Sequence, residues 1–367
     1  MKKLLPFFIS AILILSVVSC GKKGSLLPPL VKMPQPPQEV KALQRGDRIL
    51  LTWKNPQSYK DGSPLPGISE VEVWLLIEKD GGEKGKKTVS IKEFEKTAER
   101  IALLTKEKFP EHRLQKESEM PQFLFSHLLQ KKDLIQKNHV FGLKVKDLKG
   151  RDSEFSGLTA VIPKRLPLPP TDVKVSLREA SVDIEWSPPQ KNIDNSSSLN
   201  VKGYNIYRSE GERVAKRINS ALVEEAKYED SDFQFGVKYI YFIRASIVDS
   251  PPFLESNDSE VAEILTKDTF APDPPSGLMA VSGRGLIALS WERSQDKDFA
   301  GYLVWRREEG EDEFKLMTPV PLQESMYTDT DVEKNKRYYY AITALDTAGN
   351  ESLKSESGSE IVEDFPS

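Results

Sequence analysis

The chain has 367 residues, a formal net charge of −4 and 29% charged residues. This length predicts two or three domains of about 100–150 residues each. The absence of a strong basic excess argues against nucleic-acid binding. The sequence contains one cysteine, so no internal disulfide can form and each domain must be held together by apolar burial.

The N-terminus has the pattern of a secretory signal. Lys2-Lys3 precedes an apolar run from Leu4 to Val18, and the small residue Ser19 stands before Cys20. The run is shorter than the ~20 residues that a membrane-spanning helix needs. We therefore expect residues 1–19 to be a signal peptide that is cleaved between Ser19 and Cys20.

The residues Val17-Val18-Ser19-Cys20 resemble the lipobox of bacterial lipoproteins. The resemblance implies that the Cys20 thiol receives a diacylglycerol and that its freed amine is acylated, for example with palmitate. Two or more acyl chains hold a protein stably at a membrane. Gly21, in place of aspartate, implies the outer membrane under the rule that applies to enteric relatives. An ordinary cleaved signal with an incidental cysteine is the alternative.

Residues 20–34 are expected to form a lipidated, Pro-rich tether. Their opening, Cys20-Gly21-Lys22-Lys23-Gly24, resembles the start of a small outer-membrane lipoprotein that assists the lipopolysaccharide-export translocon. This resemblance implies an accessory role in an outer-membrane assembly machine as one alternative function. A linker of ordinary composition is the other interpretation.

The rest of the chain repeats itself in three copies. Each copy begins with a Pro-rich segment, at Pro34, Pro167 and Pro272. A strand ending on a tryptophan follows each segment, and the same two spacings separate the segments and the tryptophans, which are Trp53, Trp186 and Trp291. Two independent features in one register indicate a true repeat.

The later strands repeat as well, because Tyr239–Ala245 matches Tyr338–Ala344. Short alternating strands at this spacing predict a seven-stranded antiparallel sandwich and an all-β fold. The residues resemble the fibronectin type III family, a relative of the immunoglobulin-like fold. The resemblance implies that the three repeated tryptophans lie in the cores and that Tyr239 and Tyr338 form tyrosine corners. His139 takes the corresponding position in the first copy and departs from the pattern.

The repeat predicts three modules, at residues 35–164, 165–268 and 269–364. The first has an additional segment at about 80–137, which we expect to be an insertion. Ser90-Ile91-Lys92-Glu93 has the form of a capping box and predicts a short helix in it. Residues 100–105 resemble a strand of the third copy, and 120–125 could add another. Function concentrates on such variable segments, although a structural embellishment is the alternative.

Motifs for catalysis do not occur. No nucleophile elbow, phosphate-binding loop or zinc-protease motif is found, and His112, His127 and His139 lack the spacing of metal ligands. We therefore expect no catalytic, cofactor-binding or metal-binding residues. Arg45-Gly46-Asp47 could be an adhesion tripeptide, but Gly-Asp is also ordinary turn chemistry. Lys84-Gly85-Lys86-Lys87 could touch anionic head groups, or form a solvated turn.

These patterns favour a non-enzymatic, membrane-anchored lipoprotein of the bacterial cell envelope. Its modules would act as spacer and as an interaction surface for another envelope protein. A carbohydrate- or peptidoglycan-binding lipoprotein is the alternative, and exposed aromatic residues would be its sign. Trp74 and Trp305 are the candidates, since we expect them on the strand face opposite the core.

Overall fold

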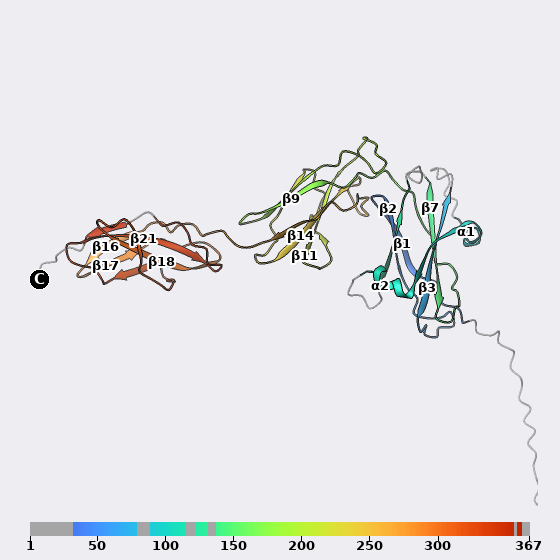
Figure 1. Cartoon of the computed structure of the whole chain (residues 1–367), viewed down its shortest axis with the longest axis horizontal. Helices are drawn as coiled ribbons and strands as arrows, with labels where there is room; N and C mark the ends of the chain where they lie inside the picture. The colour runs from blue at the N-terminus through green and yellow to red at the C-terminus, as the bar shows by residue number, and fades with distance from the viewer. Residues whose placement is uncertain (1–31, 79–88, 115–121, 131–136, 356–357, 362–367) are drawn as a thin grey trace, which may run out of the picture. The chain divides into compact units, whose positions relative to one another are not determined.

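The structure is a computed structural model that describes residues 32–78, 89–114, 122–130, 137–355 and 358–361. The expected signal, Ser19, Cys20 and residues 84–87 lie outside this part of the chain. The chain divides into two compact units, residues up to 44 with 48–164, and residues 45–47 with 165 onward. In the described residues, no helix has the length and apolarity to cross a membrane. Almost all of the regular structure is β-strand (Figure 1).

The first module is a sandwich of two four-stranded sheets, ordered β1-β2-β6-β5 and β4-β3-β7-β8. Helix α1 precedes β4, and a 3₁₀ turn and helix α2 follow it. The elements are β1 (Gln38–Arg45), β2 (Arg48–Lys54), β3 (Ile68–Glu78), α1 (Ile91–Thr97), β4 (Glu99–Thr105), η1 (Lys106–Lys108), α2 (Phe109–His112), β5 (Arg113–Leu114), β6 (Gln122–Leu128), β7 (Asn138–Asp147) and β8 (Thr159–Val161).

Two strands of segment 80–137, β4 and β6, belong to the seven-stranded plan of the sandwich. β4 pairs antiparallel with β3, and β6 pairs with β2. Phe123 of β6 lies opposite Trp53 and stacks on it at a centroid distance of 5.8 Å. Among the described residues, the additions to the seven-stranded plan are therefore α1 and the η1–α2–β5 stretch. These additions are shorter than the insertion at about 80–137 that the sequence predicts.

The second and third modules share one plan. Each packs a three-stranded sheet on a four-stranded sheet, β13-β10-β9 on β12-β11-β14-β15 and β16-β17-β20 on β19-β18-β21-β22. This is the seven-stranded antiparallel sandwich that the sequence predicts. The strands are β9 (Thr171–Leu177), β10 (Val182–Ser187), β11 (Gly203–Glu210), β12 (Lys216–Arg217), β13 (Lys227–Asp230), β14 (Lys238–Ser246), β15 (Ala262–Leu265), β16 (Met279–Gly283), β17 (Leu286–Ser290), β18 (Phe299–Glu308), β19 (Lys315–Leu316), β20 (Met326–Asp329), β21 (Arg337–Asp346) and β22 (Gly358–Ile361).

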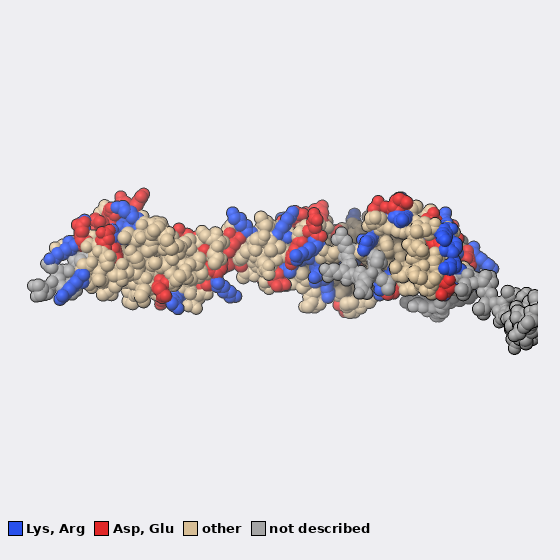
Figure 2. All heavy atoms as spheres, turned by 90° about the horizontal axis from the view of Figure 1, so that it is seen from below, with Lys and Arg blue, Asp and Glu red and all other residues tan. Residues whose placement is uncertain are grey.

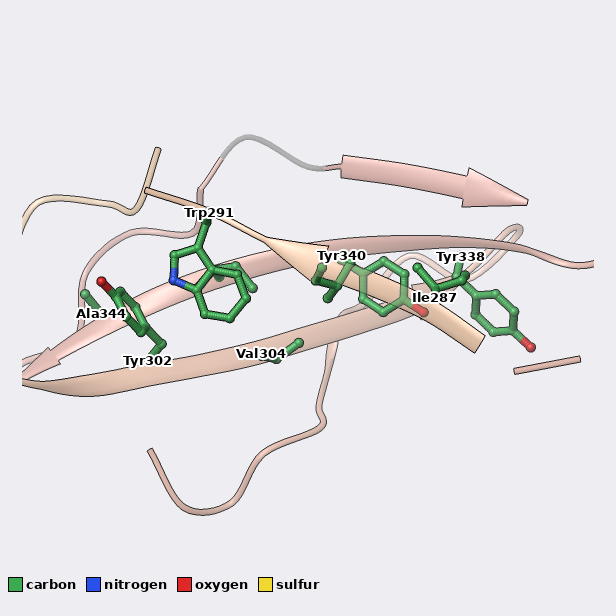
Figure 3. Close-up of a cluster of buried hydrophobic side chains, with 9 residues drawn as sticks. Ile287, Trp291, Tyr302, Val304, Tyr338, Tyr340 and Ala344 are labelled. Atoms are coloured by element: carbon green, nitrogen blue, oxygen red, sulfur yellow. The ribbon is translucent and has the colours of Figure 1, made fainter. Parts of the chain in front are cut away.

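Each module fills its own core from alternate strand positions, as a period of two requires. Trp53, Trp186 and Trp291 are all buried. Trp291 meets the edge of Tyr302 at 5.2 Å, and Trp186 meets Tyr204 at 5.1 Å. Figure 3 shows Trp291 beside Tyr302 in the core of the third module. Such edge-to-face pairs add about 0.5–1.5 kcal/mol beyond the area that they bury.

The second residue of β14 and of β21 is a buried tyrosine whose hydroxyl is bonded to the backbone. The hydroxyl of Tyr239 accepts a hydrogen bond from the N–H of Gln234 at 3.1 Å, and that of Tyr338 accepts one from Glu333 at 2.9 Å. These are tyrosine corners. In the first module buried His139 stands in this place, and its Nδ1 lies 3.1 Å from the carbonyl oxygen of Lys137.

Candidate interaction surfaces

The histidines take separate positions in the first module. His112 lies on α2, and its Nδ1 is 2.9 Å from the carbonyl oxygen of Leu124. The ring of His127 lies 5.9 Å from the ring of Phe141, and His139 is buried on β7.

The Arg45-Gly46-Asp47 tripeptide lies at the turn between β1 and β2. Arg45 ends β1, Arg48 begins β2, and Gly46 has a φ of +51°.

One group of three acidic side chains within 4.8 Å occurs in the described residues, namely Asp268, Asp298 and Asp346. The Asp346 carboxylate is already engaged, because the N–H and Nδ2 of Asn350 both donate to it at 2.7 Å. The hydrogen bonds from Asn350 show that the Asp346 carboxylate stabilises a turn.

A buried polar network recurs in the second and third modules. In the second, Arg208 Nη1 lies 2.7 Å from Asp230 Oδ2, and the Tyr241 hydroxyl donates to the same oxygen at 2.8 Å. In the third, Arg306 and Tyr340 meet Asp329 at 2.9 Å and 2.7 Å. The first module has an apolar pair at the matching register, Leu75 opposite Phe141.

The network joins the two sheets of each sandwich. Asp230 ends β13 of one sheet, whereas Arg208 and Tyr241 face each other on β11 and β14 of the other. Burial raises the pKa of Tyr241 and of Tyr340, and their bonds to the aspartates raise it further, so both phenols remain donors. Every member has a partner, and we assign these groups a structural role.

An open groove of about 470 Å³ lies beside this network in the second module. Arg208, Arg213, Lys216, Asp230 and Asp232 are among its lining residues. Its charges are mixed, and Arg208 is bound to Asp230 and Asp232. The groove therefore presents no concentrated charge of one sign for a ligand.

Helix α1 covers the outer face of β3 and β7 in the first module. Ser90 caps the helix, since its side chain accepts from the N–H of Glu93. Buried Phe94 meets Phe155 edge-on at 5.2 Å, and Phe155 meets Trp74 at 5.7 Å. Gly142 lies opposite Trp74, where an added Cβ would come within 2.8 Å of the Phe94 ring. Trp74 is thus on the outer strand face, as expected, but it packs in a second apolar cluster.

The equivalent face of the third module has no such helix among the described elements. Trp305 lies on it with Nε1 donating to Thr343 Oγ1 at 3.0 Å, and the Lys354 ammonium lies 4.1 Å from its ring centroid. Beside it the Arg307 guanidinium lies 4.2 Å from the Tyr339 centroid. Each ring is therefore covered on one side by a cation.

The outer face of the other sheet of the third module carries no charge. Its strands β16, β17 and β20 pair in two regular rows, Met279–Ser290–Met326 and Val281–Ala288–Thr328. The residues Met279, Val281 and Met326 are 63%, 61% and 63% exposed. We call these positions, with Gly283 and Leu286, the uncharged face. Figure 2 shows a broad area of the C-terminal module without charged residues.

The same sheet of the second module is charged at matching positions. There Lys174 lies opposite Glu185, which lies opposite Lys227, and Asp183 lies opposite Glu229. The fold therefore tolerates charge at these sites. Exposed apolar patches that could have been charged mark interaction surfaces, because interface cores are depleted of charge.

The sequence patterns predicted the outer tryptophans and segment 80–137 as candidate interaction sites, but they did not predict the uncharged face. Its signal is present in the repeat, since Asp183 of the strand before Trp186 corresponds to Ala288 of the strand before Trp291. The Arg–Asp–Tyr network has a similar signal, because both β13 and β20 end on aspartate two residues after a tyrosine.

A family described as RIMBP2-like, immunoglobulin-like domain matches residues 165–268, which hold β9 to β15. The chain also resembles Exoglucanase B of Cellulomonas fimi, with 29% identity over 227 residues, 59% of this chain and 19% of that protein. Amylopullulanase of Thermoanaerobacterium saccharolyticum is 39% identical over 87 residues, 23% of this chain and 6% of that protein. The chain thus spans less than a fifth of these relatives.

The solved structure of chicken CNTN1 FN1-FN3 domains is 17% identical, covering 90% of this chain and 99% of that one with a TM-score of 0.27. The family match and the strand plan of the separate modules together show that this chain carries tandem immunoglobulin- or fibronectin-like sandwiches.

Proposed function

We propose that this chain is a non-enzymatic lipoprotein of the bacterial cell envelope, anchored in the outer membrane through lipid on Cys20. Its modules act as spacer and present a protein-interaction surface to another envelope protein. The interaction role is supported by the uncharged face of the third module. The matching sheet of the second module carries charged residues at the same positions. The anchor is supported by the lipobox resemblance of Val17–Cys20.

The interaction role is tested by crosslinking in cells followed by mass spectrometry. The variant Met279→Lys/Met326→Lys gives the third module the residues that stand at matching positions of the second, Lys174 and Lys227. We expect crosslinked protein to be recovered with the wild-type chain and lost with this variant. Equal recovery from both chains, with intact folding, would show that the uncharged face is not the interaction surface.

The anchor is tested with labelled palmitate and membrane flotation. We expect the wild-type chain to incorporate the label and to float with membranes, and the variant Cys20→Ala to do neither. The control Ser19→Ala keeps a small residue at the cleavage site and should retain both properties. Cleavage of Cys20→Ala at the same site with unchanged membrane association would contradict lipidation.

Carbohydrate binding is a second candidate, favoured by Trp305 and Tyr339 on one outer sheet face and by the exoglucanase and amylopullulanase names of the relatives. Aromatic rings stack on the apolar faces of sugars. Retention on a polysaccharide column should fail with Trp305→Ala and survive with Trp74→Phe, since Trp74 packs in the cluster below α1. Lack of retention by the wild-type chain would exclude this candidate.

A further inference from the structure

We propose that the outer face of β18 and β21 in the third module binds a neutral polysaccharide built of flat pyranose rings. Trp305 and Tyr339 are the rings on which the sugars stack. This inference rests on carbohydrate binding, the second candidate function above, and names the class of ligand and the residues that hold the site.

In the first two modules, side chains of the same module cover the aromatic residue at the position of Trp305. Trp74 packs in the cluster below α1. The ring of Tyr207 stacks on Phe242 at a centroid distance of 5.0 Å, and the Arg244 guanidinium lies 4.0 Å from the Tyr207 centroid. Both rings are therefore engaged within their own module.

The indole of Trp305 is held in one orientation but lacks such a cover. Its Nε1 donates to Thr343 Oγ1 at 3.0 Å, and the Thr343 hydroxyl donates to Glu351 at 2.7 Å. Thr343 is 1% exposed, whereas Trp305 is half-buried. In the described part of the chain no second ring meets Trp305, and the Lys354 ammonium lies over it at 4.1 Å from the centroid. A ring that is both oriented and partly exposed suits a binding platform, because it loses little freedom when a ligand stacks on it.

Tyr339 supplies a second ring within reach of the first. Trp305 lies opposite Ala341, and Arg307 lies opposite Tyr339, so the two rings are diagonal neighbours on the same face. Such neighbours lie about 7–8 Å apart on a sheet, and successive units of one sugar chain can therefore contact both. Arg307 donates to the carbonyl oxygen of Glu311 at 2.9 Å, which fixes the guanidinium beside the Tyr339 ring.

The polar groups beside the rings favour a sugar over an apolar ligand. Arg307 and Lys354 offer N–H donors, and exposed Glu351 offers an acceptor. A pyranose ring has apolar faces for stacking and hydroxyls at its edge that both donate and accept, so it can satisfy all three groups. An apolar side chain of a partner protein would desolvate them without a hydrogen bond, which is costly. Lys354 makes no ion pair with any described residue, so its ammonium can leave the indole for a sugar hydroxyl.

The charge of the module favours a neutral chain of sugars. Acidic residues outnumber basic residues in residues 269–364, and Glu308 and Glu309 directly follow Arg307. A polysaccharide with a carboxylate on each unit would meet a field of its own sign. Uncharged sugars avoid this repulsion and keep the stacking.

The test measures the binding of cellohexaose and chitohexaose, two neutral oligosaccharides of flat units, by isothermal titration calorimetry. It uses the full chain in a detergent without a sugar head group. Trp305→Ala and Tyr339→Ala should each weaken binding about tenfold, because each removes one stacking ring. Trp74→Phe is the control and should bind as the wild-type chain does. Cellohexaose oxidised to the carboxylate at each C6 should bind more weakly than cellohexaose.

Thr343 is tested as a positioning residue. Thr343→Val keeps the shape but removes the acceptor of the Trp305 N–H, and it should weaken binding about fivefold. Thr343→Ser should restore the affinity, which a loss of packing alone would not allow. Equal binding by Thr343→Val and the wild-type chain would show that this hydroxyl does not position the indole.

The outcomes separate this site from the candidate function on which it rests. If a hexasaccharide binds but Trp305→Ala and Tyr339→Ala bind it equally well, carbohydrate binding stands and this face is not the site. If the wild-type chain is retained on a polysaccharide column but binds neither hexasaccharide, or binds the oxidised form more tightly, the ligand class is wrong. If it binds no carbohydrate in either experiment, the candidate function and this inference both fail.

Discussion

Arg306 Nη1 lies 2.9 Å from the carboxylate oxygen of Asp329, inside the third sandwich. The same oxygen accepts the Tyr340 hydroxyl, so the aspartate holds two donors from the opposite sheet. The side chain of Asp329 is 1% exposed, whereas Asp331, which also contacts Arg306, is 91% exposed. The two carboxylates that contact Arg306 therefore differ in how strongly solvent screens them.

Replacing Asp329 should therefore destabilise the third module far more than replacing Asp331. Asp329→Ala removes the buried carboxylate from a guanidinium whose side chain is only 15% exposed and leaves it with the exposed contact to Asp331. Breaking a buried pair in this way typically costs about 3–5 kcal/mol. Asp331→Ala removes an exposed contact, worth about 0–1 kcal/mol. Urea denaturation of both variants gives the two free energies of unfolding, and equal losses would contradict the structural role of the network.

The tyrosine corner of the third module predicts a smaller effect. Tyr338→Phe keeps the buried ring but removes the acceptor for the Glu333 N–H. The expected loss is about 1 kcal/mol of unfolding free energy. Tyr339→Phe on the outer face is the control and should change the stability little. Thermal unfolding followed by circular dichroism measures the stability of both variants. If Tyr338→Phe loses no more stability than Tyr339→Phe, the hydrogen bond of the tyrosine corner does not stabilise the module.

The cluster below α1 predicts that Phe94 shields Trp74. Phe94→Ala removes a fully buried ring, and such changes cost about 3–5 kcal/mol. The emission of Trp74 should shift to the red and become accessible to acrylamide, measured in a chain whose other tryptophans are phenylalanine. Ile91→Ala on the same helix alters a side chain that is 48% exposed and should leave the emission unchanged.

Asp147 predicts a pH dependence of the first module. Burial by itself raises the pKa of Asp147, but hydrogen bonds from Arg151 and Tyr59 outweigh it and lower the pKa from 3.8 to about 2. A carboxyl with a depressed folded pKa stabilises the fold above its unfolded pKa, and that contribution is lost as the pH falls through the folded pKa. We expect a loss of about 2 kcal/mol between pH 5 and pH 2.

The measurement for Asp147 is urea denaturation at both pH values. Asp147→Asn should reduce the pH dependence by about 2 kcal/mol, whereas exposed Asp152→Asn should retain it. A wild-type chain whose first module is equally stable at pH 5 and pH 2 would contradict the assignment.

The repeat made much of the fold predictable, because tryptophan and tyrosine at fixed strand positions report both burial and register. Trp53, Trp186 and Trp291 indicate where each module begins even where the intervening sequence differs. Segment 80–137 was harder to interpret. There α1 and the η1–α2 stretch separate β3, β4 and β6, so strand spacing no longer reports which sheet each strand joins.

The uncharged face could not be predicted from one strand alone. Met279 and Val281 are ordinary strand residues, and their meaning depends on the outward side and on the neighbours across the sheet. Pairing supplies that information, because it places Met326 beside Ser290 although they are far apart in sequence. A similar limit applies to Trp74. Its strand position and the helix that begins after Ser90 could both be predicted, but the sequence did not indicate that this helix covers Trp74.

Gly142 makes the covering helix and the sheet beneath it dependent on each other. The positions that match it carry Phe242 in the second module and Ala341 in the third, opposite Tyr207 and Trp305. A helix laid on either of those faces in the manner of α1 would meet a side chain. Among related chains, we expect any that lack α1 to accept larger residues at position 142, and any that keep α1 to keep the glycine. The helix and the glycine should therefore be gained and lost together.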